Sequence, residues 1–90
     1  MSKSYLIIAE GTVQGVGFRY YTRQKAEALG ICGTVENLTD GSVRIHAYGE
    51  SPGIDKFLLW CHNGPSSASV DDLHYEVTAP GDKDIFAIIR

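Results

Sequence analysis

Apolar and polar residues recur with two different periods along the chain, which predicts both strands and helices. Short apolar or alternating runs are typical of strands, because successive side chains of a strand point to opposite faces. In Ser42 to Tyr48, apolar residues alternate with Arg44, His46 and Tyr48, which are predicted to face outward. The predicted strands are Tyr5 to Glu10, Ile31 to Leu38, Ser42 to Tyr48 and Val70 to Val77, with Ile85 to Ile89 as a short last strand or an edge.

Two other stretches follow the helical period. Tyr20 to Leu29 consists mainly of good helix formers, and Gly30 after it is a residue that commonly ends helices. The second stretch carries apolar residues at the i, i+3, i+4, i+7 spacing and is ended by Asn63-Gly64-Pro65. Ser51 is predicted as its N-cap and Pro52 as its first helical residue.

The order of these elements is strand, helix, strand, strand, helix, strand, with a short extra strand at the end. This order is the split βαβ, ferredoxin-like pattern. We therefore expect an α+β sandwich in which an antiparallel sheet is covered on one face by two helices. No linker, internal repeat or low-complexity segment divides the 90 residues, so residues 1–90 are expected to form a single domain.

Composition narrows the range of partners. The formal net charge is −3 and the eight Lys and Arg residues are scattered singly, whereas nucleic-acid binders usually gather basic residues on one face. No run reaches the roughly 18 consecutive apolar residues of a membrane span, and the N-terminal apolar run is too short for a signal peptide. We expect no nucleic-acid partner, no membrane partner, a cytoplasmic location and a monomer.

The chain offers few metal-binding or redox residues. Cys32 and Cys61 form no CxxC pair, and together with three scattered histidines they match no zinc spacing. The predicted topology puts the two cysteines at opposite ends of the sheet, so both are expected to be free thiols. Asp71 and Asp72 are neighbours in a strand and therefore point to opposite faces. The histidines and these aspartates are expected to be solvated surface residues, and no metal or cofactor is expected.

The stretch EGTVQGVGFR, residues 10 to 19, joins the first predicted strand to the first helix. The first turn of a helix has unpaired N–H groups and a positive dipole end, and glycines let the backbone approach an anion closely. Arg19 stands at the helix start, and its guanidinium fork suits a phosphate. The stretch lacks both the GK[ST] ending of a P-loop and the third glycine of a dinucleotide motif. It favours anion binding, and the alternative is a plain glycine-rich connection with a solvated arginine.

The expected topology brings a second polar residue to this loop. The first strand ends at the loop and the second strand runs back toward it, so Asn37 returns to the same end. By alternation with Val35, Asn37 lies on the helix-covered face. It could therefore reach a ligand in the loop, and the alternative is a turn-initiating asparagine before Asp40-Gly41.

These segments together resemble the acylphosphatase family. Gly11 to Arg19 (GTVQGVGFR) is similar to the first signature of the family, and Gly33 to Asn37 (GTVEN) followed by DGSV is similar to the second. Gly64-Pro65 and the ending Phe86 to Ile88 also match, so the resemblance spans nearly the whole chain. It implies a ferredoxin-like enzyme that hydrolyses the carboxyl–phosphate bond of a small acyl phosphate substrate without a metal.

The resemblance also implies roles for individual residues. Arg19 would bind the phosphoryl group together with backbone amides of the loop, and Asn37 would orient the attacking water. The implied site residues are Arg19 and Asn37 as catalytic residues and Gly15, Val16, Gly17, Phe18 and Arg19 as phosphate-binding residues.

Two positions depart from the family pattern. The family often has an aromatic residue where this chain has Thr34, and a basic or neutral residue where it has Glu36. Both alternate with Asn37 and should point onto the open face of the sheet. We expect them to alter substrate range or affinity, and not to abolish catalysis.

Three functions are weighed against one another. The leading one is an acylphosphatase, and the alternative is a non-catalytic phosphate- or anion-binding regulatory module. The third is an RNA-binding module of similar topology, which the negative net charge and the lack of an aromatic platform disfavour.

Overall fold

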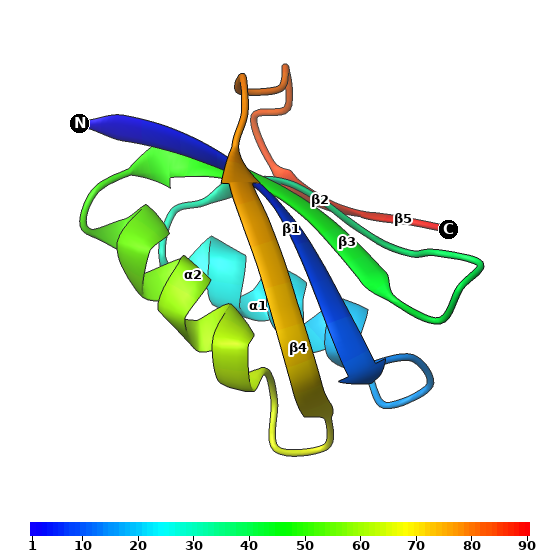
Figure 1. The fold of residues 1–90 in the computed structure, drawn as a ribbon. Coiled ribbons are helices and arrows are strands. Elements are labelled where there is room, and N and C mark those ends of the chain that lie inside the picture. Colours follow the sequence, from blue (N-terminus) through cyan, green and yellow to red (C-terminus); the bar gives the residue numbers. More distant parts are fainter.

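Five strands and two helices follow one another in the computed structural model, which describes residues 1–90. Both helices cover the same face of one sheet (Figure 1). The elements are β1 (Ser2–Thr12), α1 (Phe18–Ala28), β2 (Cys32–Asn37), β3 (Val43–Glu50), α2 (Gly53–Asn63), β4 (Ser69–Val77) and β5 (Phe86–Ile89). The ferredoxin-like α+β fold expected from the sequence is therefore confirmed, and the last segment is a strand at the sheet edge.

The sheet differs from the expectation in one respect. Its strand order is β4-β1-β3-β2-β5, and all neighbours pair antiparallel except β2 and β5, which are parallel. The sheet is thus mixed and not purely antiparallel. The connection between β4 and β5 stays at the end of the sheet where β2 begins, so β5 can only run in the direction of β2. As a result, the C-terminal ends of β2 and β5 lie at the same end of the sheet (Figure 1).

The core lies between the helices and the sheet. Its side chains come from the inward positions of β1, β2 and β3 and from the apolar stripes of both helices, which is the burial that these amphipathic elements need. The fully buried residues include Ile7, Val35, Val43, Ile45, Phe18, Ala26, Ile54, Phe57 and Cys61. Neither helix is long or apolar enough to cross a membrane.

The outer face of the sheet is less exposed than the alternation suggests. Tyr48 is on this face as predicted, but it is only 9% exposed. The connection between β4 and β5 covers its ring, and the N–H of Lys83 donates a hydrogen bond to its hydroxyl at 2.8 Å. His46 is half-buried, and its Nε2 lies 2.9 Å from the carbonyl oxygen of Ala79 in the same connection. His46, which was expected to be solvated, and Tyr48, which was expected to face outward, are therefore both partly covered.

The start of α2 is shifted by one residue from the prediction. Pro52 is the N-cap, and its carbonyl oxygen accepts the first helical hydrogen bond, from the N–H of Lys56 at 3.0 Å. Ser51 makes no side-chain cap, so its predicted role as the N-cap is wrong. The end of the helix is as predicted, with Asn63 as its last residue and Gly64 as the C-cap.

Candidate functional site

The loop after β1, the start of α1 and the ends of β2 and β5 surround one small cavity. Its volume is about 210 Å³, below the roughly 300–1,000 Å³ that drug-sized ligands occupy, so it suits a small ligand. Its lining residues are Val13, Gly15, Gly17, Phe18, Arg19, Tyr20, Arg23, Asn37, Ile88 and Arg90. The structure therefore brings the glycine loop and Asn37 together, as the predicted topology requires.

Two glycines shape the floor of this cavity. Gly15 and Gly17 have φ angles of 76° and 77°, in the left-handed region that favours glycine. Gly17 is also the N-cap of α1, so no side chain caps the helix. No turn, loop or cap hydrogen bond is donated by the backbone N–H groups of residues 15–20. These N–H groups at the positive end of α1 are therefore available to an anion.

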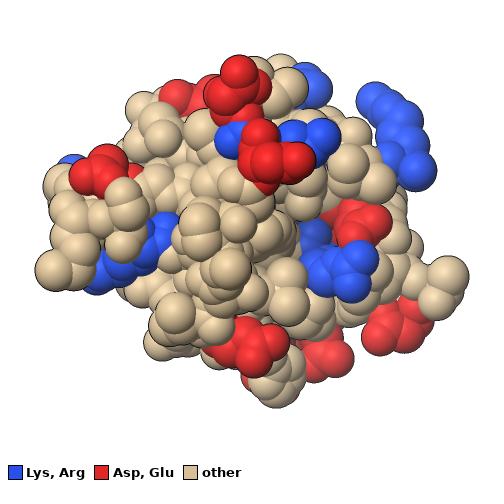
Figure 2. All heavy atoms as spheres, turned by 90° about the horizontal axis from the view of Figure 1, so that it is seen from above, with Lys and Arg blue, Asp and Glu red and all other residues tan.

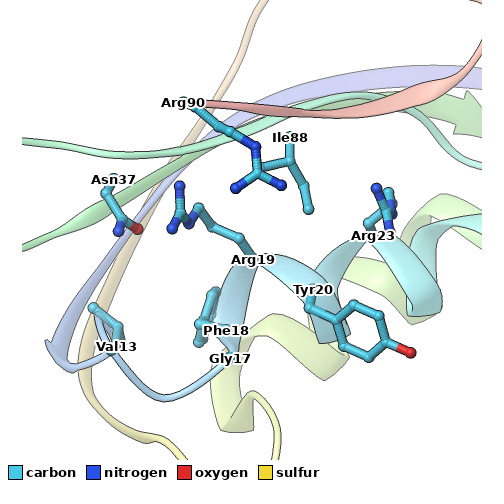
Figure 3. A pocket seen from close by; sticks show the side chains of 10 residues that line it. Val13, Gly17, Phe18, Arg19, Tyr20, Arg23, Asn37, Ile88 and Arg90 are labelled. Atoms are coloured by element: carbon cyan, nitrogen blue, oxygen red, sulfur yellow. The ribbon is translucent and has the colours of Figure 1, made fainter.

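Arg19 is held above this floor. It is half-buried on the first turn of α1, and no carboxylate forms an ion pair with it. Figure 3 shows its guanidinium group between the side chains of Asn37 and Arg90. An arginine without a carboxylate partner keeps its five donors for a ligand, and its planar fork can hold two oxygens of a phosphoryl group.

Asn37 is the last residue of β2 and faces the cavity from the sheet. Its Oδ1 atom is buried and accepts no hydrogen bond from the protein. Leaving a buried acceptor unpaired costs about 1–3 kcal/mol, and such atoms are rare enough to require an explanation. The oxygen is therefore a candidate acceptor for a ligand or a water held in the cavity (Figure 3).

Gln14 ties the loop to the turn that follows Asn37. Its Nε2 donates hydrogen bonds to the carbonyl oxygens of Leu38 and Ser42, both at 2.8 Å. Asp40 closes the same turn by accepting from the N–H and the hydroxyl of Ser42, and these hydrogen bonds lower the pKa of the Asp40 carboxyl. The loop and the end of β2 are thus fixed to each other by one side chain, whose role the sequence alone did not reveal.

Not every predicted phosphate-binding residue lines the cavity. Val16 does not, and its carbonyl oxygen accepts a hydrogen bond from the hydroxyl of Ser67 at 2.7 Å. The side chain of Phe18 is 1% exposed and packs in the core. Both residues can therefore contribute to an anion site only through the backbone.

Five lining residues were not among the site residues predicted from the sequence, namely Val13, Tyr20, Arg23, Ile88 and Arg90. Arg23 lies four residues after Arg19, and this spacing puts both on one face of α1, so the helical period could have identified it. Ile88 and Arg90 carry no such signal. They reach the cavity only because β5 pairs in parallel with β2.

The unusual Glu36 does not face this cavity. It lies on the opposite face of the sheet, where it forms an ion pair with Arg44 on the neighbouring strand. Its negative charge is therefore compensated locally. Thr34, two residues earlier, lies on the same outer face, beside His46.

Other chemically capable groups lie elsewhere. Glu10, Asp72 and His74 bring two carboxylates and an imidazole within 4.8 Å of one another, which the spacing of the sequence did not suggest. Their side chains are 48%, 60% and 62% exposed, and the imidazole pairs with both carboxylates. Cys61 is buried in α2, and burial raises the pKa of its thiol, so it is not a thiolate nucleophile. Both cysteines are free, as expected.

Known proteins share this sequence and fold over almost the whole chain. The family model for acylphosphatase matches residues 5–88. An acylphosphatase of Thermotoga petrophila is 45% identical over 86 residues, which cover 96% of each chain. The structure of an acylphosphatase from Coxiella burnetii matches with a TM-score of 0.92 at 34% identity, over 98% of this chain and 93% of that one. The acylphosphatase of Bacillus subtilis matches with a TM-score of 0.92 at 33% identity, over 100% of both chains. Since both the family model and these full-length relatives agree, the chain belongs to the acylphosphatase family.

Proposed function

We propose that this acylphosphatase hydrolyses the carboxyl–phosphate bond of a small acyl phosphate by in-line attack of water, without a metal. The observation that carries the proposal is the pair of unpartnered groups facing one small cavity, the guanidinium of Arg19 and the Oδ1 of Asn37. Every group in the proposal comes from one chain, so a monomer suffices.

Arg19 and the loop amides bind the phosphoryl group. The phosphoryl oxygens carry the negative charge of the substrate and of a loose transition state, which mainly requires positioning and charge stabilisation. The guanidinium takes two of these oxygens, and the N–H groups at the start of α1 take the third. These donors are fixed by the helix and the glycine turns, so they need little reorganisation during the reaction.

Asn37 positions the water. Its Oδ1 accepts a hydrogen bond from the water and holds the oxygen in line with the bond that breaks. An amide is not a base, so the proton of the water passes to a phosphoryl oxygen. The new P–O bond forms as the bond to the acyl oxygen breaks, and the electron pair of that bond leaves with the carboxylate.

The leaving group explains why no general acid is needed. A carboxylate has a conjugate acid with a pKa of about 4, so it leaves without being protonated. Neither an acidic side chain nor a histidine lines the cavity. A phosphate monoester would instead release an alkoxide or a phenoxide, either of which is far more basic than a carboxylate, and we expect it to be a very poor substrate.

The purified protein is expected to hydrolyse benzoyl phosphate equally well with and without a metal chelator. No step of the proposal passes through a metal ion, so chelation should leave kcat/KM unchanged. The measurement is the release of benzoate or phosphate, with phenyl phosphate as the matched monoester control. Phosphate binding by calorimetry without turnover of benzoyl phosphate would instead favour the non-catalytic anion-binding module.

Replacing Gln14 by alanine is expected to lower the free energy of unfolding by about 1–2 kcal/mol, because two hydrogen bonds to backbone carbonyls are lost. It should also lower kcat/KM about 10-fold, because the loop and Asn37 are no longer held together. Urea denaturation and benzoyl phosphate kinetics measure the two effects. Gln24→Ala, on the exposed side of α1, is the control. A Gln14→Ala enzyme with unchanged stability and activity would contradict this role.

A further inference from the structure

The cavity holds more positive charge than one phosphoryl group requires. Three of the four arginines of the chain line it, namely Arg19, Arg23 and Arg90, and no acidic residue does. The fourth, Arg44, lies on the other face of the sheet and is paired with Glu36. The whole chain carries a net charge of −3, so this concentration of cations is local and does not follow from the composition.

None of the three arginines has a carboxylate partner within ion-pair distance. Arg23 lies over the ring of Tyr20, whose centroid is 6.0 Å from its guanidinium carbon. Elsewhere, cations and carboxylates are interspersed, as on the face that Figure 2 shows. Like charges gathered around one small cavity repel one another, which an anion bound between them would relieve.

The guanidinium groups of Arg23 and Arg90 lie on the side of the cavity away from Asn37 (Figure 3). The parallel pairing of β2 and β5 sets Glu36 beside Ile89, so the next residues of the two strands are Asn37 and Arg90. In Figure 3 the guanidinium of Arg90, the side chain of Ile88 and then Arg23 lie on the far side of Arg19 from Asn37. In-line attack by a water held at Asn37 requires the acyl group to leave on that far side.

We propose that Arg23 and Arg90 form a subsite for a second anionic group on the acyl part of the substrate, with Ile88 contacting the carbon chain between the two anions. This inference rests on the proposed function and names its substrate class: acyl phosphates whose acyl group carries a carboxylate or a phosphate-type group. Arg19 serves the phosphoryl group, whereas Arg23 and Arg90 select the acyl group.

The test compares substrates that differ only in the second charge. Benzoyl phosphate carries none, 3- and 4-carboxybenzoyl phosphate carry a carboxylate, and 3-phosphonobenzoyl phosphate carries a phosphate-type group. At low salt, the wild-type kcat/KM for the better carboxylate or phosphonate substrate should exceed that for benzoyl phosphate by about 10-fold. This preference should shrink as salt is added, because the subsite is partly exposed. Comparing the carboxylate and phosphonate substrates identifies which anion the subsite takes.

The kcat/KM for the better carboxylate or phosphonate substrate, divided by the kcat/KM for benzoyl phosphate, is expected to fall to about one in Arg23→Gln and in Arg90→Gln. Arg44→Gln removes the same charge from the other face of the sheet, so it should keep the wild-type ratio. Calorimetry with phenylphosphonate and 3-carboxyphenylphosphonate tests the same preference in binding alone, and the carboxylated ligand should bind the wild type more tightly.

Two results would overturn the inference. One is a wild-type enzyme with no preference for the doubly charged substrates and ligands, and the other is a preference that survives either substitution. Turnover of benzoyl phosphate together with such a result would leave the hydrolytic function standing and remove only the subsite. Absence of any turnover would count against the hydrolytic function, while the calorimetry would still decide the subsite.

Discussion

Arg19→Ala is expected to lower kcat/KM for benzoyl phosphate by at least about 10³-fold and to remove competitive inhibition by inorganic phosphate. Removing one fixed donor to a developing oxyanion costs about 10²–10³-fold, and an arginine that stabilises phosphoryl transfer contributes about 10³–10⁵-fold. A 10³-fold loss corresponds to about 4 kcal/mol of transition-state stabilisation. Ground-state binding should be lost as well, because in the proposed mechanism the guanidinium contacts the phosphoryl group before and during the reaction. Steady-state kinetics and phosphate calorimetry measure the two losses.

The fold should survive this substitution. Arg19 forms no ion pair, and it shares its cavity with two other cations, so its removal leaves no partner unsatisfied. The free energy of unfolding is expected to change by no more than about 0.5 kcal/mol. Arg44→Ala is the matched control, and it should retain activity because Arg44 lies on the opposite face of the sheet. Arg19→Lys keeps the charge but not the fork, so it should recover only part of the rate. An Arg19→Ala enzyme that keeps its activity would exclude the proposed mechanism.

Asn37→Ala is expected to lower kcat by about 10²-fold or more while leaving inhibition by inorganic phosphate largely intact. The proposed phosphate contacts of Arg19 and the loop do not involve Asn37, so ground-state binding of the anion should persist. Only the positioning of the attacking water is lost, and a misplacement of about 1 Å can cost 10²-fold. The measurement is kcat for benzoyl phosphate beside the inhibition constant of phosphate.

Stability should move in the opposite direction from activity in this variant. The Oδ1 of Asn37 is buried and unpartnered, so its removal should leave the protein at least as stable. Asn63→Ala, at the exposed end of α2, is the control and should leave kcat unchanged. Loss of phosphate inhibition together with turnover would contradict the division of roles between Arg19 and Asn37.

Most of the fold could be predicted because its elements have strong local signals. The alternation of β3 and the apolar stripe of α2 depend only on which side chains must be buried. The predicted N-cap of α2 was wrong by one residue. The helix starts where the N–H of Lys56 donates a hydrogen bond to the carbonyl oxygen of Pro52, and the side chains give no sign of this backbone contact. The burial of Tyr48 was also missed, because the chain that covers it comes from the β4–β5 connection, far along the sequence.

The candidate site likewise contains some residues that local sequence signals identify and others that only distant contacts place. The residues around Gly15, Gly17 and Arg19 were identified because a left-handed glycine turn at a helix start is a local property. Asn37 followed from tracing strand directions, which needs only the order of the elements. Gln14 was not identified, because its two acceptors belong to a turn more than twenty residues away.

The sequence by itself determined the elements, the family and the candidate anion-binding loop, since periodicity, glycine conformation and helix-end electrostatics act between near neighbours. Only the tertiary structure decided which charged side chains line the cavity. The parallel pairing of β5 with β2 is a long-range choice of strand partner, and it places Arg90 beside Asn37 and on the same face as Ile88. A glycine loop with one arginine thereby becomes part of a cavity with three, and the sequence of β5 alone carries no sign of it.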